Sequence, residues 1–337
     1  MKTIYAVLFI LFFVCVSFVK EAKAGDPLPS WNETQIKKSI LNYLNDSIAV
    51  IPVKDRIAVF DMDGTIACEA PLWFEMYVAI NGLNQKWAAN HKLLNYPEYQ
   101  YARFLAINSF DTLITNHWAN PVNYIDSMVW KAYAGTDNEV YVDSARAFLS
   151  RTKSQDPRFK KMLLADQFYQ PMLELIQLLK EKQFEIYVVS GSVQGVIWSI
   201  CPQTIGLDRA HLIGTTQILK TQLNSSENKI QFIIQKGIFQ PKDDKDGKSL
   251  NIYSHIGKAP VFAFGNTTGD FMMFHSTSSS KYPHAEYLLN HDDTLREYAY
   301  PPYHGTANST WKDSMRIYHW NQVDMSKEFK TVWMIKK

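Results

Sequence analysis

Apolar and polar positions along the chain follow two different periods, which mark strands and helices. Short apolar runs that end in polar loops predict strands at 57–60, 184–189, 261–264, 285–290 and 331–335, and a β-hairpin from 212–219 and 229–235. Helices are predicted over 31–48, 171–182 and 248–257. Strand and helix alternate, so we expect a doubly wound α/β fold, a parallel sheet with helices on both faces.

The stretch from 67 to 160 differs in amino-acid composition from the rest of the chain. It is rich in Trp, Tyr and Asn, has few β-branched runs, and predicts helices over 70–81, 97–109 and 138–151. We therefore expect a helical cap inserted at 67–160 into a core that comprises 25–66 and 161–337.

The first 24 residues have the pattern of a secretory signal peptide. Lys2 is followed by a run of 16 residues, 4–19, interrupted only by Ser17, and then by small residues at Ala22 and Ala24. The run is slightly shorter than the roughly 20 residues of a membrane span, which favours cleavage over an uncleaved anchor. We expect cleavage near Ala24 and an exported protein, periplasmic or secreted, without a stable membrane span.

Charge and composition narrow the classes of partner. Apolar residues make up 46% and charged residues 20% of the chain, as in globular proteins. The signal segment carries Lys2, Lys20 and Lys23 against Glu21, a net charge of +2 that equals the charge of the whole chain, so the mature protein is nearly neutral. This balance favours neither nucleic acid nor an anionic membrane as partner. Cys68 and Cys201 would form a disulfide or remain two buried thiols.

The strongest chemical signal is Asp61-Met62-Asp63-Gly64-Thr65, directly after the strand at 57–60. Two carboxylates two residues apart can divide nucleophilic attack and proton transfer between them. Gly64 allows a sharp turn that presents backbone N–H groups to an anion.

These residues resemble the first motif, Asp-x-Asp-x-Thr, of the haloacid dehalogenase superfamily of phosphatases. The resemblance implies that Asp61 is the nucleophile and Asp63 the general acid/base. Ser190-Gly191, at the end of a strand, is similar to the second motif, and Ser190 would bond the phosphoryl group. Gly265-Asn266-Thr267-Thr268-Gly269-Asp270 resembles the fourth motif.

The third motif is a lysine, and two candidates exist. Lys248 opens the helix before the fourth motif, whereas Lys258 directly precedes the strand of that motif. In phosphoserine-phosphatase-like members the lysine opens the helix, which favours Lys248. Its ammonium would neutralise charge on Asp61 and on the phosphoryl oxygens.

The resemblance also implies a Mg²⁺ cofactor and a phosphate cradle. The expected metal ligands are Asp61, the Asp63 carbonyl, Asn266 and Asp270. Many relatives have Asp where this chain has Asn266, but an amide carbonyl is an acceptable ligand for a hard cation. The phosphate would contact residues of the first two motifs, namely Met62, Gly64, Thr65 and Gly191.

The substrate should be set by residues of the cap. Glu69 and Trp73 follow the first motif closely, and Trp73 and Tyr77 share a face at helical spacing. An acid beside aromatic rings suits a cationic amine; the alternative is that these aromatic residues belong to the core.

We expect a phosphoric monoester hydrolase acting through an aspartyl phosphate on a small phosphorylated metabolite, such as phosphocholine or phosphoserine. The alternatives are a phosphotransferase of the same fold and a non-catalytic phosphate-ester-binding protein. Near the C-terminus, His291-Asp292-Asp293 is expected to cap a helix, with a place near the site as the alternative. Residues 298–304 are expected to form a packed surface loop.

Overall fold

The computed structural model describes residues 25–108, 112, 124–154, 156–159, 162–239, 241–301 and 308–335. The expected signal peptide, 1–24, lies outside these residues. Within the described ranges, no helix combines the length and the apolar content that a bilayer crossing requires.

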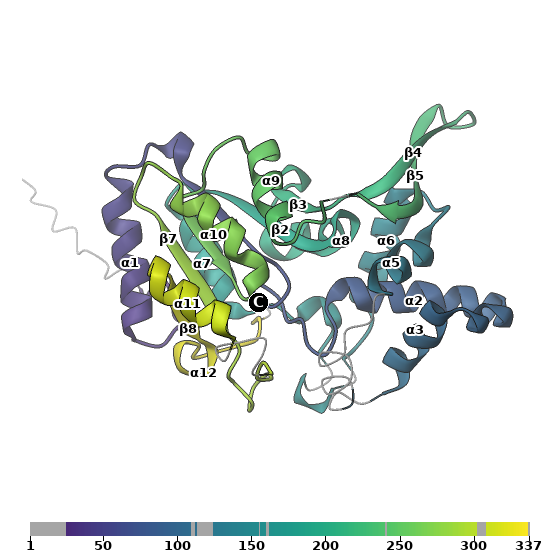
Figure 1. Ribbon diagram of the computed structural model, residues 1–337, viewed down its shortest axis with the longest axis horizontal. Coiled ribbons are helices and arrows are strands. Elements are labelled where there is room, and N and C mark those ends of the chain that lie inside the picture. Colours follow the sequence, from purple (N-terminus) through teal and green to yellow (C-terminus); the bar gives the residue numbers. More distant parts are fainter. Residues whose placement is uncertain are drawn as a thin grey trace, which may run out of the picture.

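A six-stranded parallel sheet forms the centre of the core (Figure 1). Its strands, in spatial order, are β3 (Leu212–Thr215), β2 (Glu185–Val193), β1 (Ile57–Phe60), β6 (Phe262–Gly265), β7 (Ala285–Asn290) and β8 (Asn321–Asp324). The predicted doubly wound α/β class is therefore confirmed.

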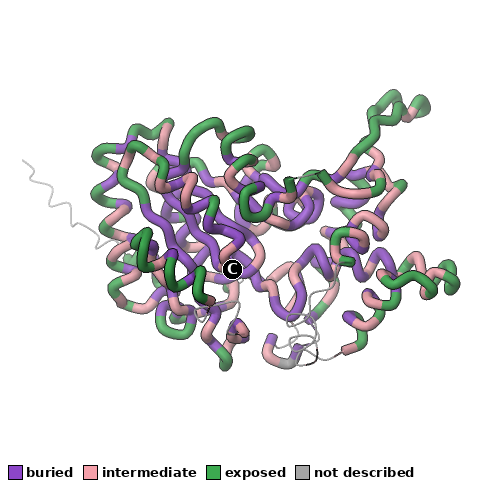
Figure 2. Tube along the Cα trace, viewed as in Figure 1, coloured by how far each residue is buried: buried purple, intermediate pink, exposed green. Residues whose placement is uncertain are grey.

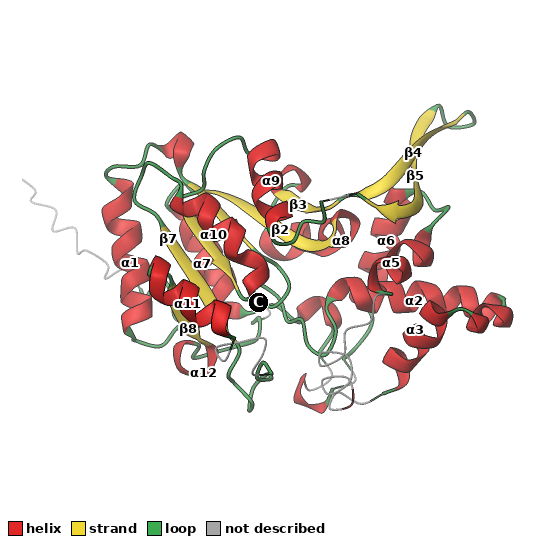
Figure 3. Ribbon diagram, viewed as in Figure 1, coloured by secondary structure: helices red, strands yellow, loops and turns green. Residues whose placement is uncertain are grey.

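Helices cover both faces of this sheet (Figure 3). They are α1 (Gln35–Ile48), α7 (Gln170–Glu181), α8 (Gln194–Ile205), α9 (Asp246–His255), α10 (Phe271–Ser278), α11 (Ser309–Tyr318) and the short α12 (Met325–Glu328). Successive side chains of β1 point to opposite faces. Ala58 and Phe60 join the cluster that includes residues of α1 and α7, whereas Ile57 and Val59 pack with residues of α9, α10 and α11. Burial on both faces explains why β1 is apolar throughout.

The cap contains four described helices beside the core (Figure 1). These are α2 (Phe74–Ala89), α3 (Pro97–Ile107), α5 (Ile125–Tyr133) and α6 (Asn138–Leu149). They lie within the expected insertion at 67–160, although α5 was not predicted.

A hairpin from the second half of the chain joins these helices. It consists of β4 (Gln217–Asn224) and β5 (Lys229–Ile238). Gly135 N donates to Ile234 O (2.9 Å), and Ile234 N donates to Thr136 O (2.9 Å). Ile234 is buried, while the far end of the hairpin is exposed (Figure 2). The cap therefore has two parts in the sequence, where the sequence analysis expected one.

Two strand predictions were wrong. The segment 212–219 is divided, because 212–215 is β3 of the main sheet and β4 begins at Gln217. Residues 331–335 form an isolated bridge, between Trp333 and Tyr169, and not a strand, and the last strand of the sheet is 321–324.

Candidate active site

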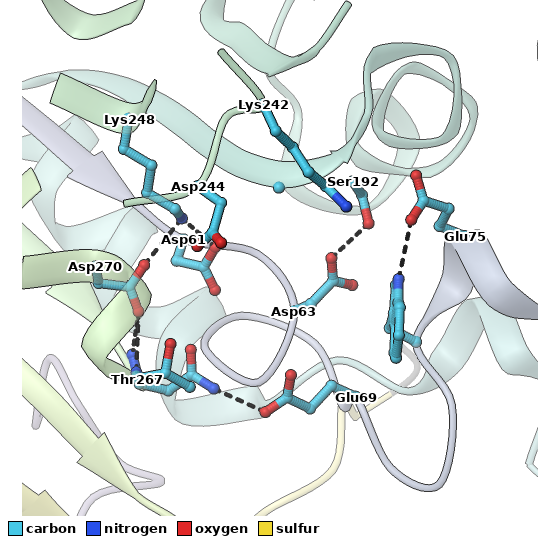
Figure 4. A pocket seen from close by; sticks show the side chains of 13 residues that line it. Asp61, Asp63, Glu69, Glu75, Ser192, Lys242, Asp244, Lys248, Thr267 and Asp270 are labelled. Carbon is cyan, nitrogen blue, oxygen red and sulfur yellow. Dashed lines mark hydrogen bonds and ion pairs between the residues drawn. The ribbon is translucent and has the colours of Figure 1, made fainter. Parts of the chain in front are cut away.

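The motif residues meet at the carboxyl ends of β2, β1 and β6, which are neighbours in the sheet (Figure 4). Asp61 directly follows β1, and its N–H donates to Phe264 O of β6 (2.9 Å). Parallel strands bring their carboxyl ends to one edge, so segments more than 200 residues apart converge there.

The loop after Asp61 is tightly wound. Met62 O accepts bonds from the N–H groups of Thr65 (3.2 Å), Ile66 (2.9 Å) and Ala67 (3.0 Å), and Gly64 N donates to Ala67 O (2.7 Å). The Gly64 and Thr65 amides are thus engaged within the loop, and the expected phosphate contacts of these two residues stay a prediction. Gly64 has φ +76°, and a Cβ there would collide with Asn266 Nδ2 and Glu69 Oε1, so the position requires glycine.

Lys248 is the lysine that the structure places at the site. Its Nζ lies 2.5 Å from Asp61 Oδ1 and 2.9 Å from Asp270 Oδ1, and it also donates to Val189 O (2.6 Å). Burial raises the pKa of Asp61, and the Lys248 ammonium opposes that shift. Burial would lower the pKa of Lys248, but Asp270 and Asp61 outweigh it and raise that pKa, so the ammonium stays charged. Lys258 instead pairs with Asp55 (3.1 Å), away from these residues.

Asp63 has the environment of a proton carrier. Ser192 Oγ donates to Asp63 Oδ2 (2.7 Å), and Ser190 Oγ lies 3.4 Å from the same oxygen. Within the described structure, Asp63 Oδ1 is buried and has no hydrogen-bond partner. Burial raises the pKa of Asp63 to about 7, which suits a group that gives and takes protons near neutral pH.

Ser192, rather than Ser190, lines the cavity. Ser190 is fully buried, and its Oγ accepts the Ser192 N–H (3.2 Å). The expected contact of Ser190 with a phosphoryl group is therefore better fitted by Ser192 and Gly191, which both line the cavity. The Ser-Gly-Ser sequence was the available signal, since residues two apart in a strand point the same way.

The fourth-motif loop holds Asp270 with both oxygens in use. Asp270 Oδ2 accepts the N–H groups of Asn266 (2.9 Å) and Thr267 (3.0 Å), and Oδ1 faces Lys248. The Thr267 side chain in turn accepts the Gly269 N–H (3.1 Å). Asp270 thus fixes the loop and the lysine.

Two oxygens beside this loop compete for one proton. The single hydroxyl proton of Thr65 is within reach of both Asp61 Oδ2 (3.2 Å) and Asn266 Oδ1 (3.1 Å). One of these buried acceptors always lacks that donor, and a hard cation takes such oxygen ligands. The described residues include no group of three or more His, Cys, Asp or Glu side chains suited to a metal. The expected ligand set combines carboxylates with the Asn266 amide and the Asp63 backbone carbonyl. All of these ligand atoms are oxygens, which fits Mg²⁺.

The cavity at this edge, of about 260 Å³, is strongly acidic. Its lining includes the carboxylates of Asp61, Asp63, Glu69, Glu75, Asp244 and Asp270 against the ammonium groups of Lys242 and Lys248. Lys242 also pairs with Asp126 of α5 (3.0 Å), which ties this wall to the cap. Sequence analysis missed Lys242 and Asp244 because no motif marks their loop.

Glu69 and Trp73 both line the cavity. Burial raises the pKa of Glu69 to about 8. Trp73 Nε1 donates to Glu75 Oε2 (3.2 Å), and Glu75 Oε1 accepts the Val193 N–H (2.7 Å) before α8. Trp73 is the N-cap residue of α2, and both Trp73 and Tyr77 pack against the core cluster, which agrees with the alternative that these aromatic residues belong to the core.

The segment after β7 supports the first-motif loop. His291 Nε2 donates to Gly64 O (2.7 Å), and His291 Nδ1 donates to Glu297 Oε2 (2.7 Å). Burial opposes the imidazolium, but Glu297 outweighs it and raises the pKa of His291. The expected helix cap was wrong, since Asp293 closes a turn through the N–H groups of Leu295 and Arg296.

Two further expectations concern buried residues. Tyr298 and Tyr300 are buried against His291, not on the surface, and 302–304 lie outside the described residues. Cys68 and Cys201 are both buried free thiols, Cys68 beside Glu297 Oε1 (3.2 Å) and Cys201 beside Met62 Sδ (3.5 Å).

Comparison with known proteins gives the class. The family model for haloacid dehalogenase-like hydrolases matches residues 58–275, so the chain belongs to this family. The Asp61-x-Asp63 pair resembles the first motif of the phosphatases of this family, which are phosphoric monoester hydrolases.

Among solved structures, one shows the same fold and others are less similar. A functionally unknown protein from Anaerococcus prevotii DSM 20548 is 14% identical with a TM-score of 0.52, over 87% of this chain and 92% of that one. A protein of unknown function from Bordetella pertussis Tohama I is 10% identical (TM-score 0.47; 80% and 98% covered). Cytosolic 5'-nucleotidase IIIB bound to cytidine is 12% identical (TM-score 0.44; 77% and 80% covered). No curated protein matches the chain.

Proposed function

We propose that the protein is an exported, Mg²⁺-dependent phosphomonoesterase that acts through an aspartyl phosphate on Asp61. The observation that carries the proposal is the pairing of two differently held carboxylates: Asp61 lies against Lys248 (2.5 Å), and Asp63 lies against a serine hydroxyl (2.7 Å) with a pKa raised to about 7. One group is poised to attack and the other to carry a proton.

The reaction has two steps. The Asp61 carboxylate attacks phosphorus, the bond from phosphorus to the ester oxygen breaks, and Asp63 protonates that leaving oxygen. Water then attacks the aspartyl phosphate while Asp63 takes its proton, which breaks the bond to Asp61 and releases phosphate. Lys248 and the Ser192 hydroxyl offset the charge of the phosphoryl oxygens.

Asp61, the Asp63 carbonyl and Asn266 are the proposed Mg²⁺ ligands. Asp270 is better placed as a support, because both of its oxygens already have partners. A bound Mg²⁺ would neutralise charge, so that a carboxylate can approach an anionic ester.

Export is proposed from the pattern at 1–24. The fold secures the residues just after the expected cleavage site, where Asp26 Oδ2 lies 2.6 Å from Lys37 Nζ. Cleavage after Ala24 would leave this ion pair intact.

The proposal predicts metal-dependent turnover. Residues 25–337 should release phosphate from para-nitrophenyl phosphate with Mg²⁺, lose that activity in EDTA, and regain it when excess Mg²⁺ is added. The measurement is free phosphate at each stage, with circular dichroism to show that the chain remains folded. Absence of turnover on this ester and on a panel of natural phosphate esters would favour the binding-protein alternative. Appearance of a phosphorylated alcohol would favour the phosphotransferase.

A phosphorylated amine is the proposed substrate class. Six carboxylates line the cavity against two ammonium groups, and the Trp73 ring adds an aromatic surface. Carboxyl groups beside an aromatic surface favour a cationic substituent such as that of phosphocholine or phosphoserine.

This substrate class predicts a selective effect at Trp73. Trp73→Ala should lower kcat/KM for phosphocholine by about tenfold relative to a neutral phosphate ester, since a desolvated cation–π contact contributes about 1–2 kcal/mol. Trp87→Ala is the matched control, because Trp87 lies on α2 beneath the Arg103 guanidinium. Equal losses on both esters in Trp73→Ala would contradict a cationic substrate.

A further inference from the structure

We propose that Glu69 and Tyr300 are positioning residues that lock the Asn266 amide so that its carbonyl oxygen faces Asp61. This inference rests on the proposed Mg²⁺ requirement and assigns Glu69 a role in the metal site. It also accounts for the neutral amide at position 266, where many relatives have an acid.

The donors of the Asn266 amide and of the Tyr300 hydroxyl find acceptors within this cluster. Asn266 Nδ2 carries two protons, one for Glu69 Oε1 (2.9 Å) and one for the Tyr300 hydroxyl oxygen. The only hydroxyl proton of Tyr300 goes to Glu69 Oε1 (2.6 Å). Each donor therefore has one acceptor, and the amide nitrogen is held on the side of Glu69 and Tyr300.

The opposite edge of the amide faces the nucleophile. Asn266 Oδ1 lies 3.1 Å from the Thr65 hydroxyl, which is itself 3.2 Å from Asp61 Oδ2. A flipped amide would set its carbonyl against Glu69 Oε1, which already serves as an acceptor, and would leave its nitrogen against Thr65. Because Asn266 and Thr65 are buried, water would not compensate for that mismatch.

The first-motif loop packs directly on this pair. A Cβ at Gly64 would collide with both Asn266 Nδ2 and Glu69 Oε1, so the turn that carries Asp61 and Asp63 is fitted against the bond between them. An acid at position 266 would place a second carboxylate beside Glu69. Asn266 and Glu69 therefore form a matched amide–acid pair. A change of charge at one of the two residues alone should lower the stability of the folded protein.

The test is Mg²⁺ affinity without substrate, measured as the rise in Tm when MgCl₂ is titrated into metal-free protein. Glu69→Leu removes the acceptor, and Tyr300→Phe removes the hydroxyl. Each should weaken Mg²⁺ binding by about tenfold or more, as loss of a group that orients a metal ligand does. Glu69→Gln keeps a carbonyl acceptor and should bind Mg²⁺ nearly as the unmodified protein does, whereas a role in binding a cationic substrate would require the carboxylate.

Tyr169→Phe is the matched control, because the Tyr169 hydroxyl donates to Glu297 and not to Asn266. It should leave Mg²⁺ affinity unchanged even if Tm falls. A charge exchange adds a second test: Asn266→Asp should lower the metal-free Tm, and adding Glu69→Gln should recover it by restoring one acid and one amide.

Three outcomes would overturn the inference. Mg²⁺ affinity in Glu69→Leu and Tyr300→Phe equal to that of the unmodified protein would show that these residues do not position Asn266. If the effects of Asn266→Asp and Glu69→Gln on the metal-free Tm were additive, residues 266 and 69 would not form a matched pair. An unmodified protein whose Tm does not respond to Mg²⁺ would instead refute the metal requirement of the proposed function, and the positioning role with it.

Discussion

Asp61→Asn is expected to lower phosphate release by on the order of 10⁴-fold or more, because an amide cannot form the aspartyl phosphate. The variant should fold, since Asn has nearly the shape of Asp and Lys248 keeps its ion pair with Asp270 (2.9 Å). The measurement is steady-state and single-turnover release of phosphate with saturating Mg²⁺.

Asp55→Asn is the control for Asp61→Asn, because Asp55 pairs with Lys258 away from the cavity. It should retain full activity. Substantial turnover in Asp61→Asn would assign the attack to another group, and loss of activity in both variants would point to a general effect on folding.

Lys248→Met is expected to lower the free energy of unfolding by about 3–5 kcal/mol, because it leaves the buried carboxylates of Asp61 and Asp270 without their cation. Urea denaturation in EDTA measures this loss without metal. Activity should fall as well, since the ammonium also offsets the charge of the phosphoryl oxygens.

Lys258→Met provides the comparison for Lys248→Met. Lys258 is exposed, with 47% of its side chain accessible, so loss of its ion pair with Asp55 should lower the free energy of unfolding far less than loss of Lys248 does. Similar losses in the two variants would mean that Lys248 does not hold the carboxylates together.

Much of the core could be predicted because burial leaves a direct mark on the sequence. The strand predictions at 57–60 and 285–290 match β1 and β7 residue for residue, since both are fully buried. The edge strand β8 is Asn-Gln-Val-Asp with only Val323 buried, so its residues carry no strand signal. The hairpin was placed wrongly at its start because 212–219 contributes to two sheets, β3 of the main sheet and β4 of the hairpin.

The residues of the site also differ in whether the local sequence predicts them. Asp61, Lys248 and Asn266 could be proposed because a motif surrounds each of them: Asp61 and Asn266 follow strands, and Lys248 lies in the first turn of a helix. His291 could be placed near the site only as the alternative to a helix cap. Glu297 and Tyr300 could not be proposed at all, because their roles arise from bonds to His291 and Glu69, the second of which spans 231 residues. Such contacts depend on how β7 sits beside β6, and nothing local in the sequence encodes that arrangement.

The hairpin that docks on the cap has a consequence for protein engineering. Because β5 bonds to the turn between α5 and α6 through Gly135, Thr136 and Ile234, a chimera that exchanged 67–160 alone would separate the cap from a strand built to match it. The cap of this scaffold is encoded in two pieces, and grafting it onto another core requires transplanting 67–160 together with 217–238.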